Sequence, residues 1–282
     1  MRNSMKNTVK EIVTAGLGAV LLSAICMLIA CTDAPDSSEY EAEKIDGGVS
    51  LIVKRDKRVI DIYAVTSDKK PVTVPIKGGI PLRIESGAPT SIPLIQTGTK
   101  LILKGNIIEL TCTNNDLTAL NVQGVPALQK LDCSGNELTS LDVHGLTALT
   151  DLVCSKNLLS LLKVHDLKAL QSLDCSDNRL ASLDIQGLPA LENLTCSGNQ
   201  LSSLNVQNLN ALSKLDCSYN RLDAHAFTTL FNNLPTRSDL VYDSARCYVY
   251  GEVPGKTEGN CKNFSSPENL KTAFEKAKTV KK

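Results

Sequence analysis

The sequence predicts a stacked solenoid, because one pattern recurs six times through the middle of the 282-residue chain with a period of 21 residues. A cysteine marks each copy, at Cys112, Cys133, Cys154, Cys175, Cys196 and Cys217. An asparagine follows three residues later, at Asn115, Asn136, Asn157, Asn178, Asn199 and Asn220. A leucine stands two residues before each cysteine. Such a period is typical of coils that stack on one another and present a long repeated surface, which favours binding as a function.

A single copy matches the leucine-rich repeat template, with cysteine in a slot that usually holds leucine. Leu131 and Cys133 are two residues apart, so in an extended strand both point inward. Lys130, Asp132 and Ser134 then point outward. We therefore expect a parallel β-sheet on the concave face, an irregular convex side, and coils about 4.8 Å apart that bury a continuous core.

The cysteine and asparagine columns are expected to lie inside this core. An asparagine side chain both donates and accepts hydrogen bonds, which suits a buried turn. We expect the six cysteines to be reduced packing thiols, because in-register parallel neighbours hold their Cβ atoms side by side rather than facing, a poor geometry for a disulfide. No metal site is predicted, since the chain has no CxxC and its histidines, at positions 144, 165 and 225, fall away from the column.

The repeats from about Glu109 to Asn220 resemble the cysteine-ladder repeats of internalin J and related bacterial surface leucine-rich repeat proteins. Their shared consensus is LDCSxNxLxSLDVxGLxAL. The resemblance covers roughly 110 of the 282 residues. It implies an extracytoplasmic adhesin or attachment role and transfers no ligand. The chain has no LPxTG-type motif near its C-terminus, so cell-wall anchoring of that kind is not expected.

The start of the chain has the layout of a secretory signal peptide. Basic residues precede an apolar run over residues 12–30. Its end, Leu28-Ile29-Ala30-Cys31, resembles the bacterial lipobox, in which the cysteine is lipidated after cleavage. We predict a signal peptide over residues 1–30 and a lipid anchor on Cys31; an uncleaved membrane anchor and plain secretion are the alternatives.

Residues 31–48 are rich in acidic side chains and are predicted to form a disordered tether. The whole chain carries 30 basic and 30 acidic residues. Cleavage before Cys31 removes three basic residues and one acidic residue, leaving 27 and 29 and a net charge near −2. That balance argues against a nucleic-acid partner.

Both ends of the solenoid need covering, so capping segments are expected. Residues 49–106 contain strand-like runs and predict a small β cap, with a separate immunoglobulin-like domain as the alternative. The repeats occupy residues 107–222. Residues 223–282 predict a cap with two helices, one built on Phe227 and Phe231 and one beginning near Ser266. Between them, we expect a disulfide joining Cys247 and Cys261.

No catalytic motif is present, so the sequence predicts neither an enzyme nor a cofactor. The third repeat turns apolar where the others are polar, and we hypothesise that Val153, Leu158 and Leu161 form a partner-binding spot. The alternative is that they are scattered surface residues. Further binding candidates are outward-facing charged residues of the repeats, namely Asp132, Asp174, Asp216, Lys130 and Lys156. The three aspartates are expected about 10 Å apart, too far for shared metal ligation.

The function that these features favour is a lipid-anchored surface protein that binds other proteins or glycans without catalysis. We expect it at the bacterial outer membrane, surface exposed, with the membrane reached through the lipid on Cys31 and the protein itself monomeric. The alternative is a periplasm-facing scaffold that holds another envelope component.

Overall fold

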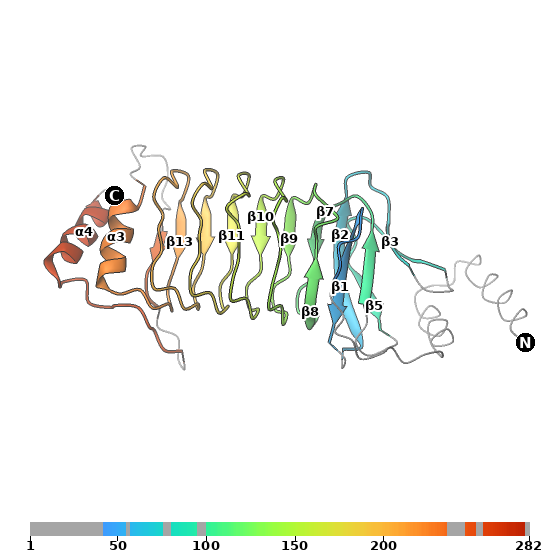
Figure 1. Ribbon diagram of the computed structural model, residues 1–282, viewed down its shortest axis with the longest axis horizontal. Helices are drawn as coiled ribbons and strands as arrows, with labels where there is room; N and C mark the ends of the chain where they lie inside the picture. The colour runs from blue at the N-terminus through green and yellow to red at the C-terminus, as the bar shows by residue number, and fades with distance from the viewer. Residues whose placement is uncertain are drawn as a thin grey trace, which may run out of the picture.

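The computed structural model describes residues 42–54, 57–75, 80–94, 100–235, 246–251 and 256–279. The molecule is elongated, with strands at its N-terminal end, a row of coils in the middle and helices at its C-terminal end (Figure 1). The predicted signal peptide and Cys31 lie outside the described residues. Within the described residues, no helix has both the length and the apolar character needed to cross a membrane.

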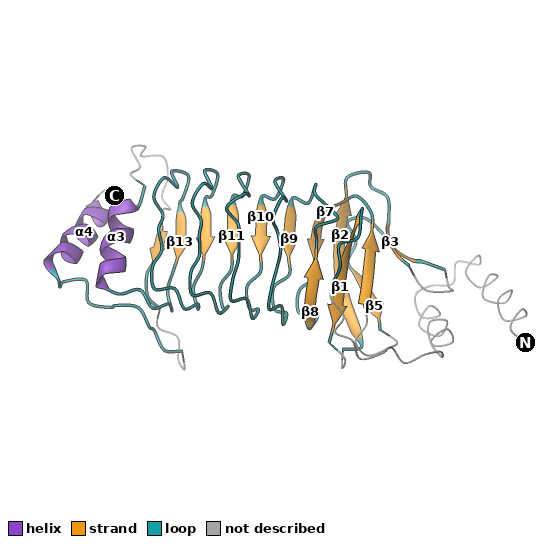
Figure 2. Cartoon of the chain, viewed as in Figure 1, coloured by secondary structure: helices purple, strands orange, loops and turns teal. Residues whose placement is uncertain are grey.

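The row of coils is a leucine-rich repeat solenoid, as predicted. One strand from each coil joins a parallel sheet in which Leu110 lies beside Leu131 and Leu131 beside Leu152, so neighbours in space are 21 residues apart in sequence. The parallel strands are β7 (Ile107–Thr111), β9 (Lys130–Asp132), β10 (Asp151–Val153), β11 (Ser172–Asp174), β12 (Asn193–Thr195), β13 (Lys214–Asp216) and β14 (Arg246–Tyr248). Strand β14 was not predicted. Turns and irregular backbone make up the rest of each coil (Figure 2).

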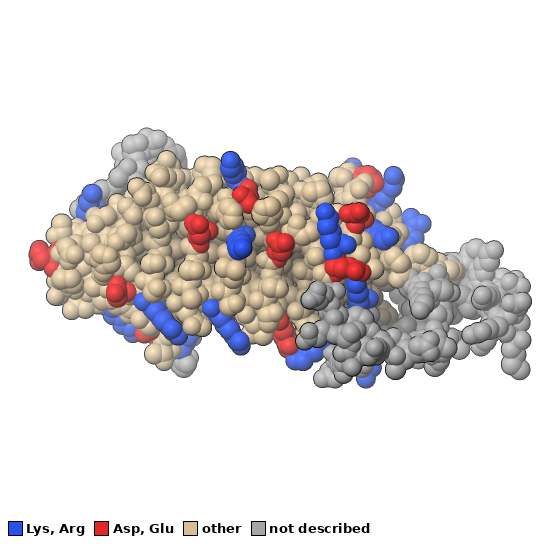
Figure 3. Space-filling model, in the orientation of Figure 1, with Lys and Arg blue, Asp and Glu red and all other residues tan. Residues whose placement is uncertain are grey.

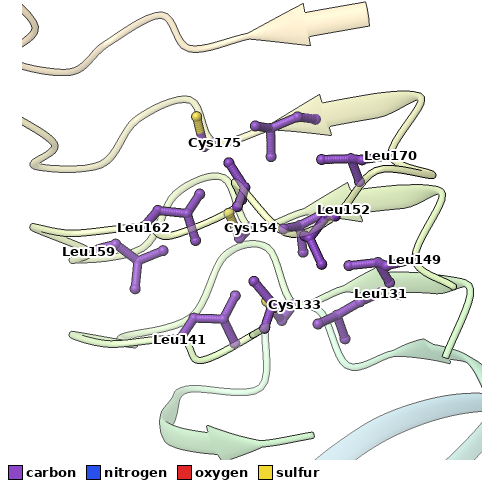
Figure 4. Packing of buried hydrophobic residues seen from close by; sticks show 14 of the residues in the cluster. Leu131, Cys133, Leu141, Leu149, Leu152, Cys154, Leu159, Leu162, Leu170 and Cys175 are labelled. Carbon is purple, nitrogen blue, oxygen red and sulfur yellow. The ribbon is translucent and has the colours of Figure 1, made fainter. Parts of the chain in front are cut away.

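The interior of the solenoid is one continuous apolar core. In Figure 4, Cys154 lies between Cys133 and Cys175 of the neighbouring coils. Leu152 lies beside Cys154, and Leu159 and Leu162 lie on the other side of the coil. All of these side chains are buried. No coil has enough apolar partners of its own, so burial depends on the neighbouring coils.

The N-terminal cap continues both sides of the first coil, which agrees with the predicted β cap. Its strands are β1 (Gly48–Val53), β2 (Val59–Thr66), β3 (Val72–Val74), β4 (Leu82–Ile84), β5 (Thr90–Pro93) and β6 (Lys100–Lys104). Strand β2 pairs antiparallel with β7 and so extends the sheet of the repeats. Strand β1 pairs antiparallel with β8 (Leu117–Asn121), which lies on the opposite side of the first coil. The cap therefore shares both of its sheets with the repeats instead of standing apart as a separate domain.

The predicted tether is wrong at its C-terminal end. The Gly47 N–H donates to the carbonyl of Gly124 in the first coil at 3.0 Å. Glu43 pairs with Lys100 of β6 at 2.6 Å. A Cβ atom on Gly124 would stand 1.7 Å from the Ile45 carbonyl oxygen, so this close approach needs glycine. Residues 42–48 thus belong to the cap.

The C-terminal cap contains the two predicted helices, α3 (Ala224–Asn233) and α4 (Glu268–Thr279). The Asp223 side chain accepts from the Ala226 N–H and so caps α3. Four phenylalanines hold the helices together, with ring centroids 5.0–5.7 Å apart. They are Phe227, Phe231, Phe264 and Phe274. This cluster covers the apolar end of the last coil.

Candidate binding face and the ladders beneath it

The asparagine column is a ladder of hydrogen bonds that joins each coil to the next. The Asn178 Oδ1 atom accepts from the backbone N–H of Leu159 in the preceding coil at 3.0 Å. Its Nδ2 atom donates to the carbonyls of Cys154 at 3.0 Å and of Cys175 at 3.1 Å. The same bonds recur at Asn136, Asn157, Asn199 and Asn220. Each side chain satisfies buried backbone groups that water does not reach.

The two caps end this ladder in different ways. At the N-terminal end, Asn115 bonds both the N–H and the carbonyl of Asp61 in β2, at 2.9 and 2.7 Å. At the C-terminal end, Asn260 supplies an additional rung: its Oδ1 accepts from the Leu222 N–H at 2.8 Å, and its Nδ2 donates to the Cys217 carbonyl at 2.9 Å. Asn260 and β14 therefore form a seventh coil, interrupted by an insertion, which the fixed period did not reveal.

The six ladder cysteines are free and fully buried, as predicted. Burial raises the pKa of Cys112 to about 12 and, helped by the nearby Asp174 carboxylate, that of Cys175 to about 12 as well. The pKa values of the other four are raised well above their usual range, also with burial as a cause. A neutral thiol away from solvent is a poor nucleophile and a poor metal ligand, so this column packs the core.

The predicted bridge between Cys247 and Cys261 is not formed; both are free thiols in the structure. Cys247 lies in β14 beside Leu215, in the leucine column of the sheet. Its thiol hydrogen-bonds that of Cys217, and this bond is the main cause of the raised pKa of Cys217. Cys261 instead donates to the Asn263 carbonyl at 3.5 Å. The prediction failed because it placed Cys247 in an irregular segment, whereas it extends the sheet.

The outward side chains of the parallel strands form a surface that we call the sheet face. Most are small and polar. The three aspartates predicted as binding candidates serve the turn after their strands: Oδ1 of Asp132 accepts from the N–H and Oγ of Ser134 at 3.0 and 2.7 Å, and Asp174 and Asp216 do the same with Ser176 and Ser218. These carboxylates have a structural role that explains their recurrence.

The structure does not bring the apolar residues of the third repeat together on the sheet face. Val153 lines a shallow hollow with Glu109, Lys130 and Asp151. Leu158 and Leu161 follow the turn at Asn157 and do not line it. Leu161 is 55% exposed. Lys156 is exposed within that turn and has a left-handed backbone, with φ of 53°. Val153 therefore lies on the sheet face, whereas the half-buried Leu158 and the exposed Leu161 lie beyond the turn that follows the strand, and their role in binding stays a prediction.

Sequence reasoning missed the aromatic residues at the C-terminal end of the sheet face. Tyr248 lies in register with Asp216, and it is 51% exposed. Tyr250 lies two residues beyond the end of β14 and is 46% exposed. The alternation Cys247-Tyr248-Val249-Tyr250 was the available signal, because it places a buried valine between two exposed tyrosines.

A second shallow hollow lies away from the sheet face. Asp166 stands 3.2 Å from Nε2 of His144 and 3.3 Å from Nε2 of His165, and both imidazoles are more than half exposed. Over the described ranges, no group of three or more His, Cys, Asp or Glu side chains is arranged to hold a metal ion. On the view in Figure 3, charged side chains of both signs are interspersed among uncharged ones, without a broad basic patch.

Comparison with known proteins finds solved structures that are similar to part of this chain. No family model and no curated protein matches the chain. Solved structures do: a Leptospira interrogans leucine-rich repeat protein is 27% identical over 36% of this chain and 28% of its own, with a TM-score of 0.35. The functional domain of InlJ from Listeria monocytogenes, described as including a cysteine ladder, is 26% identical over 55% of this chain and 38% of its own, with a TM-score of 0.41.

A third structure, the internalin InlF from Listeria monocytogenes, is 20% identical over 46% of this chain and 41% of its own, with a TM-score of 0.41. The chain thus spans less than half the length of each of these neighbours. The predicted resemblance is confirmed at the level of the repeat. By its own geometry the chain forms a leucine-rich repeat solenoid with a column of buried cysteines.

Proposed function

We propose that this chain is a bacterial surface protein, anchored by a lipid on Cys31, that binds another protein through its sheet face. The observation that carries the proposal is the contrast between the two sides of each strand. Inward side chains such as Leu173 and Leu194 are required by the core. Outward side chains such as Asn193 and Thr195 are half-exposed and make no contribution to the core. Seven parallel strands present such side chains as one surface.

Support for binding without catalysis comes from the chemistry of this surface. Over the described residues, the strongly raised pKa values belong to buried thiols, which have no access to a substrate. Perturbed groups in an accessible cleft, which usually mark an active site, do not occur on the sheet face. Exposed tyrosines at its end are residues that often dominate protein interfaces.

The binding proposal is tested by blocking the face. The unmodified full-length chain is first used to capture its protein partner from cells. We expect the double variant Ser172→Arg with Asn193→Arg to lose this capture, because two long side chains would then project side by side from adjacent strands. The matched control is Ser182→Arg with Ser203→Arg, which adds the same charge on exposed positions outside the strands. Equal loss in both variants, or none in either, would contradict the proposal.

The anchoring proposal has a separate test. We expect incorporation of a labelled fatty acid into the full-length chain expressed in bacteria, its loss in Cys31→Ala, and its retention in Cys26→Ala. Protease treatment of intact cells should then digest the solenoid if it faces outward. Protection from the protease, with labelling intact, would favour the periplasm-facing scaffold instead.

A further inference from the structure

We infer that the C-terminal end of the sheet face binds an acidic segment of the protein partner; this rests on the proposed function and specifies its ligand. Lys214 and Arg246 lie side by side on β13 and β14 as register partners. Both are exposed. Within the part of the chain that the structure describes, neither makes an ion pair.

Two other cations near the sheet face are neutralised by carboxylates of the chain itself. At the other end of the same face, Lys130 and its register partner Glu109 form an ion pair at 3.3 Å. Lys256 pairs with Asp177 at 2.6 Å. Like charges directly opposite each other on neighbouring strands are destabilising, so the fold gains nothing from placing Lys214 beside Arg246.

The nearest carboxylate on the same strand makes no ion pair with either cation. Asp216 lies two residues beyond Lys214, and its Oδ1 accepts from both the N–H and the Oγ of Ser218. Its backbone carbonyl accepts from the N–H of Cys196 at 2.8 Å. Asp216 is thus held to its own turn, and the two cations remain available to an anion from outside.

The flanking tyrosines indicate that the anion is part of a polypeptide. Tyr248 lies two residues beyond Arg246 on β14 and Tyr250 follows just after the strand, each with about half of its surface exposed. Tyr250 is held in place by Phe264 of the C-terminal cap, with ring centroids 6.4 Å apart. Tyrosine and arginine are the residues that most often anchor protein interfaces, and guanidinium groups bind carboxylates through two parallel hydrogen bonds. Together they suit a segment in which carboxylates lie next to an apolar or aromatic residue.

The inference is tested with synthetic peptides and the full-length chain in detergent. We expect a fluorescent oligoglutamate peptide carrying one tyrosine to bind, and the same peptide with glutamine in place of glutamate to bind at least tenfold more weakly. Binding should weaken as salt is raised, since the contacts are exposed charges. A sulfated oligosaccharide of similar charge serves as the comparison ligand.

Charge reversal sharpens the test. Lys214→Glu with Arg246→Glu should reduce binding of the acidic peptide at least tenfold and create binding of an oligolysine peptide. Tyr248→Ala should weaken acidic-peptide binding several-fold without reversing the preference. Lys168→Glu is the control, because this exposed lysine lies by the histidine hollow, away from the sheet face. Unchanged thermal unfolding in each variant shows that the fold is kept.

Three results would overturn the inference: no binding of the acidic peptide, equal binding by the charge-reversed variant, or tighter binding of the oligosaccharide that the charge reversal abolishes. The proposed function fails separately. If the face-blocking arginines abolish partner capture while the reversal of Lys214 and Arg246 leaves it unchanged, the sheet face binds a protein but not through this end.

Discussion

The two ends of the solenoid are closed by different means, although they cap the same repeat. At the N-terminal end, antiparallel strands β1 and β2 continue both sides of the first coil. At the C-terminal end, β14 adds one more parallel strand, and helices cover the core behind it. At the first end, the one cation of the sheet-face hollow, Lys130, is paired with Glu109 and lies among further carboxylates, Asp132 and Asp151. The second leaves two adjacent cations and two tyrosines exposed.

This difference indicates how a repeat protein separates stability from recognition. Antiparallel pairing moves the edge of the sheet away from the repeats, to β5 of the cap. A short parallel strand at the other end closes less of the core, so the C-terminal end depends on individual side chains such as Asn260 and Glu258. The C-terminal end, which has fewer backbone hydrogen bonds between strands, is also the end whose exposed side chains differ from those of the repeats.

The largest expected effect is the loss of a central rung of the asparagine ladder. Asn178→Ala removes the partner of the Leu159 N–H and of two cysteine carbonyls, all buried. We expect the free energy of unfolding to fall by about 3 kcal/mol or more, because each orphaned buried group costs about 1–3 kcal/mol. Asn193→Ala, on the sheet face, should change it by less than about 0.5 kcal/mol. Urea unfolding followed by circular dichroism measures both.

The same substitution at the ends tests the comparison. Asn115→Ala and Asn260→Ala should each cost less than Asn178→Ala, because an end coil can fray without unfolding its neighbours. We expect hydrogen exchange to accelerate locally in each variant, over β2 and β7 in the first and over β14 in the second. Acceleration across the whole solenoid in both would show that the ends are not independent.

Alkaline pH is expected to destabilise the fold through the thiol ladder. An unfolded cysteine ionises near its ordinary pKa of 9.0, whereas Cys112 and Cys175 in the fold ionise only near 12. The stabilisation is therefore complete below pH 9 and is lost as pH rises from 9 to 12, by up to about 1.4 kcal/mol per pH unit for each buried thiol. Denaturant midpoints measured across this range should fall less steeply for Cys175→Ala than for the parent chain. Parallel curves would contradict this assignment.

Thiol accessibility distinguishes the ladder from the C-terminal end at neutral pH. Cys247 and Cys261 are half-buried, and the six ladder thiols are fully buried. We expect a thiol reagent to modify Cys261 and Cys247 on the native protein first, and the ladder cysteines only on unfolding. Peptide mass mapping after short exposure identifies the order. Early modification of Cys154 would contradict a closed core.

A smaller effect is expected at the insertion of the seventh coil. The Glu258 carboxylate accepts from the backbone N–H groups of Tyr219, Gly251 and Asn260 at 2.8–2.9 Å. Glu258→Ala should lower the free energy of unfolding by about 2 kcal/mol, since charge-assisted bonds to a half-buried carboxylate are lost. Thermal unfolding monitored by circular dichroism provides the measurement.

The smallest effect is expected for the ion pair beside this insertion. Lys256→Ala removes the pair with Asp177 and the contact of the ammonium group with the Tyr219 ring at 4.6 Å. Both partners of the ion pair are more than a third exposed, so the loss should stay below about 1 kcal/mol. A larger loss than that for Glu258→Ala would mean that the ion pair, and not the carboxylate, fixes the insertion.

The repeats were predictable because their spacing is rigid and their inward residues are nearly invariant from copy to copy. The seventh coil was not, since Val249 replaces cysteine and Asn260 follows Asn220 by 40 residues instead of 21. The role of Asp132 in its turn was also hidden, because the sequence does not distinguish a carboxylate bound by Ser134 from one facing water. Candidate binding residues were the least predictable part, since Tyr248 becomes part of the sheet face only through the pairing of β14 with β13.

The asparagine ladder also bears on how the length of this molecule can change. Each rung joins only adjacent coils and does so with the same atoms every time. In-frame duplication or deletion of 21 codons would therefore insert or remove one coil and leave every remaining junction unaltered. Both capping segments would still meet a coil of the kind they meet now. The distance between the N-terminal cap and the end that carries Tyr248 could thus change in steps of one coil, while the residues that form each end stay the same.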